Sequence, residues 1–410
     1  MEGGCMRIIH TADWHIGQEL HSFSRRFEHE TFLYWLLGQC RQNRPDALLI
    51  TGDIFHHANP SNESMEMFAR FTERAHAALS SLAIVAVAGN HDSPARFDAL
   101  VPLARAGVRL VGAVPRRSDG FDVDRLLIRA GDGAILAMPF LRLGDLPAAG
   151  GDETLQGRVA ELYLQTWEAC AAGMARAPCV VTGHLHVSGG QESESERPIL
   201  IGGEQAVSIE CFPSEAAYVA LGHLHLPQHM DSGRIRYSGS PIPLTAKERT
   251  YPHEIVLLDI APDGTRTATG IPVPRSVPHL LIPSTGGVEP ERALDLIAST
   301  LADLGVPSDL PSERRPFVEI SLRLNEPRPK AAADLTEEIA RAGLPVRLVR
   351  VATCLRVAVD QPNGVAVPQG LDGHTPQTLF PLAFKSAHAG AVPAAGHVAA
   401  FNAVLMETSP

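Results

Sequence analysis

Several features that mark particular protein classes are missing from this chain of 410 residues. No apolar run reaches the roughly 18 residues that a membrane-spanning helix needs. The N-terminus MEGGCMRIIH lacks the basic start and long apolar stretch of a signal peptide. The phosphate-binding pattern G-x-x-x-x-G-K-[ST] is also absent, so any ATP-driven step must come from a partner. These absences predict a cytoplasmic protein without an ATPase site of its own.

Paired cysteines and an excess of positive charge are lacking as well. Six cysteines, at positions 5, 40, 170, 179, 211 and 354, show no C-x-x-C spacing, which argues against a disulfide framework and a zinc ribbon. The formal net charge of −11 argues at first sight against nucleic-acid binding, because duplex affinity comes from phosphate neutralisation. The distribution of charge matters more than its sum, since bound cations would offset carboxylates gathered at one site.

What the chain does have is five short blocks of Asp, His and Asn within its first 225 residues, each directly after an apolar run typical of a β-strand. The blocks contain Asp13, His15, Asp53, Asn90, His91, Asp92, His184, His223 and His225. Carboxylate, imidazole and amide oxygen are ligands for hard or borderline divalent metals, and no cysteine lies in any block. The series predicts a two-metal centre that cleaves phosphoesters.

The spacing of these blocks suits a shared site. In an open α/β sheet the carboxyl ends of the strands line one edge, so loops from several strands can converge on one crevice. Asp13 and His15 are two residues apart and point to the same side of an extended segment, and His223 and His225 repeat that spacing. We expect the glycine before the ligand in four blocks to let the backbone turn without a Cβ clash. These are Gly52, Gly89, Gly183 and Gly222.

Each block taken alone has an ordinary structural explanation. An isolated Asp-x-His is a weak signal, and Gly-Asp after a strand is usually a turn in which Asp bonds its own backbone. Gly-His-Leu-His could be two surface histidines at a strand end. All five blocks together, each after a strand and in this order, favour the metal centre.

The series D-x-H, GD, GNHD, GH and GHxH resembles the calcineurin-like metallophosphoesterases. Within that superfamily, MRIIHTADWHIGQ, TGDIFHHANPS, AGNHDSPARF, and ALGHLHLPQ followed by YSGSPIPL are similar to the SbcD-type nuclease subunits. The resemblance covers about residues 6–260, with a weaker echo further on. It implies an α/β fold of four layers, two sheets flanked by helices, with a small α/β cap domain and a dinuclear site usually served by Mn²⁺.

The resemblance also implies a role for each residue of the blocks. One metal would be held by Asp13, His15 and His225, the other by Asn90, His184 and His223, with Asp53 bridging both. His91 matches a histidine that binds no metal and assists catalysis beside the scissile phosphate, by neutralising phosphoryl charge or donating to the leaving oxygen. Asp92 could orient or charge-support that imidazole.

Other histidines are predicted to lie outside the metal set. His186 makes a second Gly-His-x-His, yet the fourth block of the family needs only His184. His56 and His57 stand where bacterial members often have Asp after GDxF, a departure that leaves the ligands untouched. His10 lies inside the first strand, where packing or hydrogen bonding is the expected role.

The chain divides into three predicted parts. Strands and helices alternate through residue 260, as in a layered α/β domain, and Pro and Thr become frequent from about Ala261. We predict a metallophosphoesterase nuclease domain at 6–260, a DNA-binding cap domain at 275–358 and a partner-binding segment at 365–410. In the cap we expect helices at 289–304 and 331–343 and strands at 317–324 and 345–351.

Two kinds of protein partner are predicted. Helices expected at 26–42 and 61–80 each carry an apolar stripe, which is either ordinary core or, as the resemblance implies, a homodimer interface. Residues 361–410 carry only Asp372, Lys385 and Glu407 as charges, and a segment so poor in charge is expected to fold against a partner. Its pattern faintly resembles the segment that binds the coiled coil of an SbcC-like ATPase.

The sequence is therefore interpreted as a Mn²⁺-dependent DNA nuclease that works with an SbcC-like ATPase in DNA repair and recombination. The resemblance suggests 3′→5′ exonuclease action on duplex ends and endonuclease action on single strands or hairpins. A phosphatase or cyclic-nucleotide phosphodiesterase of the same fold is one alternative, but residues 280–410 weigh against it. A scaffold that has lost its metals is another, and the presence of all seven ligands weighs against that.

Overall fold

The computed structural model describes residues 5–100, 107–118, 120–148, 154–174, 177–193, 196, 206–355, 376–387, 391–398 and 400–401. The chain forms two compact units, residues 1–356 and residues 357–410. Among the residues described, no helix combines the length and the apolar character needed to cross a membrane.

The first sheet has six strands in the order β16-β15-β1-β4-β5-β6. They are β1 (Met6–Thr11), β4 (Ala47–Thr51), β5 (Ala83–Val87), β6 (Val108–Val111), β15 (Glu254–Ile260) and β16 (Arg266–Pro272). Strands β1, β4, β5 and β6 run parallel, and β15 and β16 extend the sheet in antiparallel pairs. The parallel strands are covered on both faces, which explains why ALLIT and AIVAV are continuous apolar runs without alternation.

The second sheet also has six strands, in the order β13-β14-β12-β11-β10-β9. They are β9 (Leu127–Ala130), β10 (Gly133–Leu136), β11 (Cys179–His184), β12 (Tyr218–Gly222), β13 (Gln228–Met230) and β14 (Ile235–Tyr237). Strands β10, β11, β12 and β14 are parallel, and the outer strands β9 and β13 are antiparallel. The five blocks thus follow parallel strands, three in the first sheet and two in the second.

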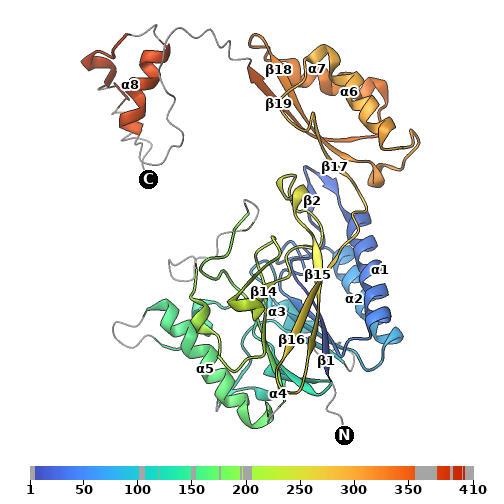
Figure 1. Ribbon diagram of the computed structural model, residues 1–410, viewed down its shortest axis with the longest axis vertical. Helices are drawn as coiled ribbons and strands as arrows, with labels where there is room; N and C mark the ends of the chain where they lie inside the picture. The colour runs from blue at the N-terminus through green and yellow to red at the C-terminus, as the bar shows by residue number, and fades with distance from the viewer. Residues whose placement is uncertain are drawn as a thin grey trace. The chain divides into compact units, whose positions relative to one another are not determined.

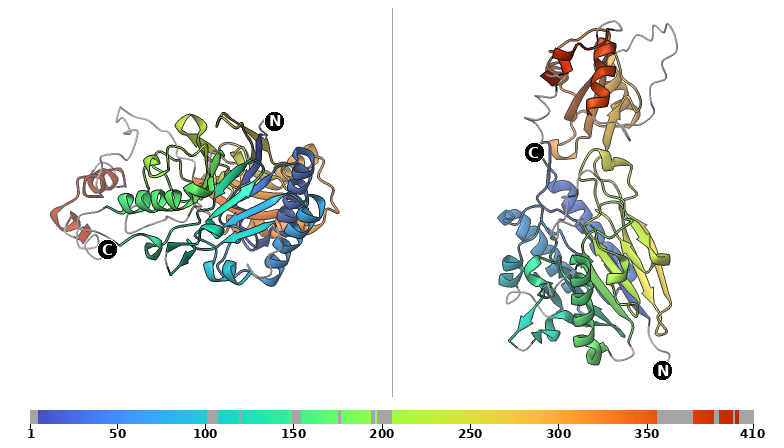
Figure 2. Two further views of the ribbon diagram at one scale, coloured as in Figure 1. Left: turned by 90° about the horizontal axis from the view of Figure 1, so that it is seen from below. Right: turned by 90° about the vertical axis from the view of Figure 1, so that its left-hand side faces the viewer.

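The two sheets pack face to face, and helices cover their outer faces. Apolar side chains such as Leu49 and Val85 of the first sheet meet Val180 and Ala220 of the second in one buried cluster. The flanking helices are α1 (Arg26–Asn43), α2 (Asn62–Ala78) and α3 (Pro94–Leu100) on the first sheet and α5 (Leu155–Met174) on the second. Figure 2 (left) shows both sheets between α5 and the α1–α2 pair. The predicted arrangement of two sheets flanked by helices is confirmed.

Shorter elements occur between these strands and helices and, in the case of η6, in the predicted cap. They are β2 (Glu19–Leu20), β3 (Phe23–Ser24), β7 (Arg116–Arg117), β8 (Gly120–Phe121), α4 (Val123–Leu126), η2 (Leu143–Asp145), η3 (Ile209–Cys211), η4 (Asp231–Gly233), η5 (Lys247–Thr250) and η6 (Ser312–Arg314).

Helices α1 and α2 lie side by side against the first sheet (Figure 1). The apolar stripe of α1, which includes Phe32, Leu36 and Cys40, is buried in the core beneath the helix together with Phe68 and Phe71 of α2. The stripes are therefore used within the chain. Tyr34, on the outer side of α1, is 73% exposed, so a homodimer would have to use the outer faces of the two helices.

The predicted cap contains a three-stranded parallel sheet of β17 (His279–Ile282), β18 (Phe317–Leu324) and β19 (Arg347–Leu355). Helices α6 (Pro290–Asp303) and α7 (Ala331–Ala342) pack on this sheet through one apolar core. The two helices and β18 agree with the predicted ones, β19 begins two residues later and is longer, and β17 was not predicted. Pro345 stands at the predicted start, where it has no N–H to donate to a ladder.

A buried polar cluster joins this sheet to the segment that opens α1. The Arg25 guanidinium lies 2.6 Å from a carboxylate oxygen of Glu28, and His279 Nε2 lies 3.7 Å from the same carboxylate. The ring of Phe317 has the Arg347 guanidinium 3.6 Å from its centroid and that of Arg25 at 5.8 Å. We call this contact between the cap sheet and the start of α1 the joint. It depends on buried charge pairing and cation–π contacts in addition to apolar packing.

The second unit contains helix α8 (Pro376–Ala387). Phe380 stacks on Phe401 with their ring centroids 4.2 Å apart, and Phe384 lies 4.8 Å from the ring of His397. Aromatic groups of this segment thus pack on one another. The parts of the predicted partner-binding segment at 365–375, 388–390, 399 and 402–410 lie outside the described residues.

The Glu28 carboxylate makes stability at the joint depend on pH. Burial works against its charge, but Arg25 and His279 lower the pKa of Glu28 from 4.5 to about 2. A carboxylate with a lowered pKa stabilises the fold above its unfolded pKa and loses that contribution as the pH falls toward its folded pKa. We expect Glu28→Gln to lower the free energy of unfolding by about 3 kcal/mol at pH 7, and this difference from the parent should shrink between pH 4.5 and 2.

Urea unfolding of both proteins across this pH range measures the effect. Glu66→Gln is the control, because Glu66 pairs with Arg70 on the surface with 60% of its side chain exposed and should contribute little. A difference between Glu28→Gln and the parent that does not change with pH would contradict the assignment.

Candidate metal centre

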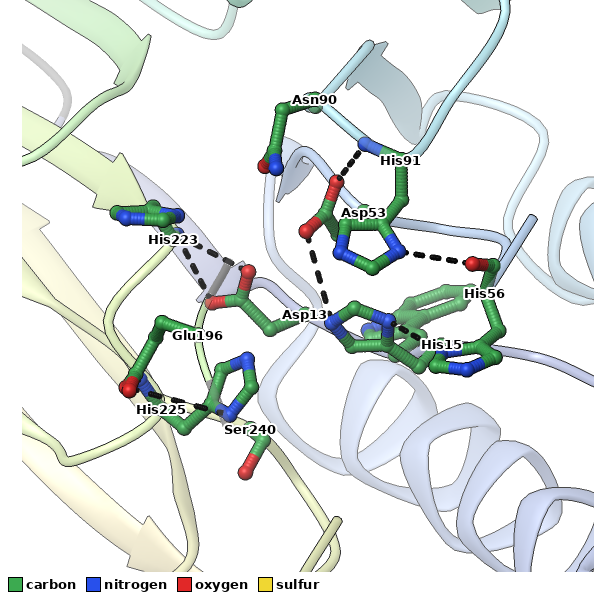
Figure 3. A network of polar contacts seen from close by, with 12 residues as sticks. Asp13, His15, Asp53, His56, Asn90, His91, Glu196, His223, His225 and Ser240 are labelled. Carbon is green, nitrogen blue, oxygen red and sulfur yellow. Dashed lines mark hydrogen bonds and ion pairs between the residues drawn. The ribbon is translucent and has the colours of Figure 1, made fainter. Parts of the chain in front are cut away.

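The residues of the five blocks converge where the carboxyl ends of the parallel strands of both sheets meet. Asp13 and His15 follow β1, Asp53 follows β4, and Asn90 with His91 follows β5. From the second sheet, His184 ends β11, and His223 and His225 follow β12. Figure 3 shows side chains from both sheets facing one another there. The proposed ligands and His91 are at most 6% exposed, apart from half-buried Asn90.

One cluster joins Asp13, His15 and His225. A ligand atom of each lies within 4.8 Å of the other two. The rings of His15 and His225 meet edge to face with centroids 5.3 Å apart. The backbone N–H of His223 donates to both carboxylate oxygens of Asp13, at 3.0 and 3.2 Å, so β12 fixes this carboxylate from the opposite sheet.

A second cluster gathers around Asp53 and His184, which form a group with Asp13 within the same 4.8 Å limit. His184 Nε2 lies 2.9 Å from Asn90 Oδ1, while its Nδ1 lies 2.9 Å from the carbonyl oxygen of Thr51. Oδ2 of Asp53 is 3.5 Å from Nε2 of His184 and 3.5 Å from Nε2 of His15. One carboxylate oxygen is therefore equidistant from a histidine of each cluster.

The donor set fits divalent cations. The buried Nε2 of His223 has no hydrogen-bond partner in the part of the chain that the structure describes, and that of His15 makes no hydrogen bond there but lies 3.5 Å from Asp53 Oδ2. A buried ring nitrogen without a partner is costly, and a cation on its lone pair would remove the cost. Imidazole nitrogen with carboxylate and amide oxygen suits Mn²⁺, Zn²⁺ or Fe²⁺.

The charges of the cluster are strongly coupled. Burial raises the pKa of Asp13 to about 7, although His184 and His225 oppose this change. Burial would also raise the pKa of Asp53, but the charges of His184 and His15 hold it well below its ordinary value. Burial lowers the pKa of His184, but the Asp53 carboxylate outweighs it and raises the value to about 9. A cation binding at His184 would have to displace a proton from that imidazole.

Four of these residues hold left-handed backbone conformations, with φ of 53° at Asp13, 47° at His15, 49° at Asp53 and 101° at His223. Non-glycine residues rarely adopt such angles, which cost of order 1–3 kcal/mol each and cluster at functional sites. The conformation turns each side chain sharply off the end of its strand. The residue types alone do not predict this left-handed conformation, apart from the tolerance of Asp for it.

The four glycines before the ligands are required mainly by close packing. Only Gly52 among them has a positive φ, of 95°. A Cβ at Gly89 would lie 2.1 Å from Asp53 Oδ1, and one at Gly222 would lie 1.9 Å from the carbonyl oxygen of Thr51. At Gly183 it would lie 2.7 Å from the Tyr163 hydroxyl. The expectation of a tight turn thus holds for one glycine, and close approach between segments explains the other three.

Asp92 was predicted to orient His91, but the imidazole of His91 contacts another group. The His91 imidazole Nδ1 lies 2.8 Å from the carbonyl oxygen of His56, and its backbone N–H donates to Asp53 Oδ1 at 2.8 Å. The Asp92 carboxylate instead accepts from the backbone N–H groups of Ile54, Phe55 and Gly89, at 2.9 to 3.1 Å. Asp92 holds the loops after β4 and β5 together, because its carboxylate oxygens accept hydrogen bonds from backbone amides of both loops.

The histidines set aside by the sequence have clear positions. His10 is buried and contacts Thr51 Oγ1, the Leu221 carbonyl oxygen and the Tyr218 hydroxyl, as expected for a hydrogen-bonded core residue. His186 lies 2.7 Å from a carboxylate oxygen of Glu192. His56 is closer to the centre than expected, because its Nδ1 lies 3.2 Å from Nδ1 of His15.

Comparison with known proteins agrees with this geometry. Residues 6–227 match the family model described as calcineurin-like phosphoesterase. The chain belongs to this family. The SbcD subunit of the nuclease SbcCD from Rhodobacter capsulatus is 40% identical over 393 residues, which cover 92% of this chain and 94% of that protein. This member of the family is thus a phosphoester-cleaving hydrolase in the group of SbcD nucleases.

Two further relatives carry the same description. The SbcD protein of Bacillus subtilis is 34% identical over 64% of this chain and 68% of its own length. That of Escherichia coli is 34% identical over 59% of this chain and 62% of its own length.

The contact at Gly222 allows a steric test of the centre. We expect Gly222→Ala to abolish phosphoester cleavage and to weaken metal binding at least tenfold, because the new methyl group would push β12 away from Thr51 and shift His223. Gly38→Ala is the control, since a Cβ at Gly38 of α1 meets nothing within 4 Å and alanine favours the helix. Mn²⁺ titration by calorimetry checks both. Full metal affinity in Gly222→Ala would show that β12 can shift without moving the ligands.

Proposed function

We propose that this chain is a Mn²⁺-dependent DNA nuclease that works in the cytoplasm as the SbcD component of an SbcCD-type repair and recombination complex. Its reactions would be 3′→5′ exonuclease cleavage of duplex ends and endonuclease cleavage of single strands and hairpins. The observation that carries the proposal is the pair of buried clusters sharing Asp53 Oδ2, in a chain similar to a known nuclease component over nearly its whole length.

The proposed ligands of the first ion are Asp13, His15 and His225, and those of the second are Asn90, His184 and His223, with Asp53 shared. The two distances of 3.5 Å at Asp53 Oδ2 support a bridging role. When bound, two cations at these residues would supply an activated water molecule and positive charge for both oxygens of an in-line displacement. The buried surroundings strengthen this effect by excluding bulk water.

His91 is proposed to act on the phosphoryl group. The His56 carbonyl oxygen accepts the Nδ1 proton of His91, which fixes the ring orientation and leaves Nε2 as the atom that gives or takes the transferred proton. In its protonated form the ring would neutralise charge on the phosphoryl oxygens or protonate the leaving oxygen. Asp92 supports this role indirectly, by holding the loop that carries His91 against the loop after β4.

Two protein partners belong to the proposal. The second unit would bind the coiled coil of an SbcC-like ATPase, because a segment so poor in charge has few groups to keep its apolar side chains in water. A homodimer would form through the outer faces of α1 and α2, where Tyr34 is exposed beside a groove lined by Leu37, Met67 and both signs of charge. Figure 1 shows the two helices side by side.

The substrate test uses the purified protein with Mn²⁺, Mg²⁺ or EDTA on blunt duplex, hairpin and single-stranded DNA, beside p-nitrophenyl phosphate. The proposal expects Mn²⁺-dependent cleavage of DNA. Hydrolysis of p-nitrophenyl phosphate with intact DNA would favour a small-substrate phosphatase, and inactivity on both substrates without bound metal would favour a scaffold.

His91 and the ligands should be separable by mutation. We expect His91→Ala to keep both ions and to cleave DNA about 10²–10⁴-fold more slowly, because it removes a proton donor and no ligand. His223→Ala should lose metal and activity together. His186→Ala is the control and should be nearly silent, since it removes the one histidine of the two Gly-His-x-His blocks that is not a proposed ligand. Metal content and cleavage rates check the three variants, and equal damage from all of them would contradict the assignment.

The partner segment can be tested by deletion of residues 365–410. Every proposed ligand lies before residue 226, so Mn²⁺-dependent cleavage of single-stranded DNA should remain largely intact. Binding to a co-expressed SbcC-like ATPase, and any stimulation by ATP, should be lost. Pull-down and cleavage assays measure both. A lower melting temperature with unchanged ATPase binding would mean that the segment serves only the chain's own stability.

A further inference from the structure

Glu248 is a buried carboxylate beside the centre that no block contains. It lies in η5 and none of its surface is exposed to solvent. Its Oε1 lies 3.2 Å from Nδ1 of His225, and its Oε2 accepts the backbone N–H of Leu244 at 2.8 Å. The hydroxyl of Ser240 lies 3.5 Å from Oε2. Each carboxylate oxygen therefore has a defined donor.

Two carboxylates face Nδ1 of His225, Glu248 at 3.2 Å and Glu196 at 4.0 Å, and of these only Glu248 is within hydrogen-bond distance of it. A carboxylate only accepts hydrogen bonds, so Nδ1 must hold a proton to bond it. The opposite ring nitrogen, Nε2, faces Asp13 in Figure 3, and a ligand atom of His225 lies within 4.8 Å of those of Asp13 and His15. An imidazole with its proton on Nδ1 has its lone pair on Nε2, which is the form that binds a metal from that side.

The carboxylate is itself held rigidly. Backbone hydrogen bonds join Glu248 to Thr245 and Tyr251, and His253 Nε2 lies 3.0 Å from the Glu248 carbonyl oxygen. The other nitrogen of His253 lies 2.7 Å from the carbonyl oxygen of Ser240. The segment from 240 to 253 is thus closed on itself around this carboxylate, which leaves Glu248 little freedom to move away from His225.

We propose that Glu248 is a positioning residue that fixes the proton of His225 on Nδ1 and so aims its Nε2 lone pair at the first ion. This inference rests on the proposed function, because it takes His225 to be a ligand. Histidine ligands whose second nitrogen donates to a carboxylate are held in one orientation and are more basic, and loss of such a partner typically weakens metal binding about 10- to 100-fold.

Glu248→Gln tests the role with almost no change of shape. The amide of glutamine has one oxygen, which can accept from Leu244 N–H or from His225 Nδ1–H but not from both. If the oxygen keeps the backbone bond, the amide NH₂ faces Nδ1, and His225 must then accept there and carry its proton on Nε2. That tautomer has no lone pair for the ion.

Two measurements read this change. In protein labelled with ¹⁵N-histidine, we expect Nδ1 of His225 to be protonated in the parent and unprotonated in Glu248→Gln. In Mn²⁺ titrations followed by electron paramagnetic resonance, the parent should show a spin-coupled pair, and the variant should bind one ion about 10- to 100-fold more weakly and show an isolated Mn²⁺ signal. Glu254→Gln is the control, because Glu254 pairs with Arg236 at 2.6 Å and should leave both readouts unchanged.

The outcomes are distinguishable. An unprotonated Nδ1 in the parent protein would overturn the inference without any variant, even if Glu248→Gln failed to fold. A variant that melts earlier but keeps the Nδ1 proton and both ions would show that Glu248 only stabilises its loop, which also overturns it. If the parent bound no Mn²⁺ at all, the proposed function would be wrong, while the histidine spectrum would still decide whether Glu248 fixes the proton.

Discussion

The close approach of the two sheets at the end of β4 is the constraint on which the centre depends. The Thr51 carbonyl oxygen lies 2.9 Å from His184 Nδ1, and only a glycine at 222 leaves room for it. His10 joins the same two sheets a little deeper, between Thr51 and Leu221. Asp53 follows this contact on one sheet and His223 on the other, so the contact determines how far apart the ligands of the two sheets lie.

Bringing the sheets so close also buries many ionisable groups in one place, which is unfavourable without a counter-charge. Hydrogen bonds to backbone amides meet part of the need, as for Asp92 and for Asp13 with the amide of His223. The rest is met by pairing among the side chains and, we propose, by two cations. The left-handed conformations at Asp13 and Asp53 are tolerated for the same reason, because the surrounding bonds leave these residues no alternative.

Alternating strands and helices predicted an α/β domain, while the two-sheet arrangement came from the family resemblance. The sequence also predicted which blocks meet, because parallel strand ends share an edge. It could not show that Asp92 binds backbone amides, since two of its three partners, Ile54 and Phe55, lie 38 and 37 residues away in the sequence. Glu248 was missed because it stands in the charged run K-E-R, which looks like a solvated surface turn. His56 was judged by its residue type alone, whereas its main-chain carbonyl is what contacts His91.

The position of Phe317 against the guanidinium groups of Arg347 and Arg25 has a consequence for the evolution of the chain. The groups in this contact come from segments nearly 300 residues apart, since Arg25 precedes α1 while Phe317 opens β18. A cap domain taken from a relative would have to bring a ring in place of Phe317 and a group in place of His279, or else the buried Arg25–Glu28 pair would lose its contacts with the cap. Recombination that separates the two segments should therefore be selected against, so that the first helix and the cap are inherited together.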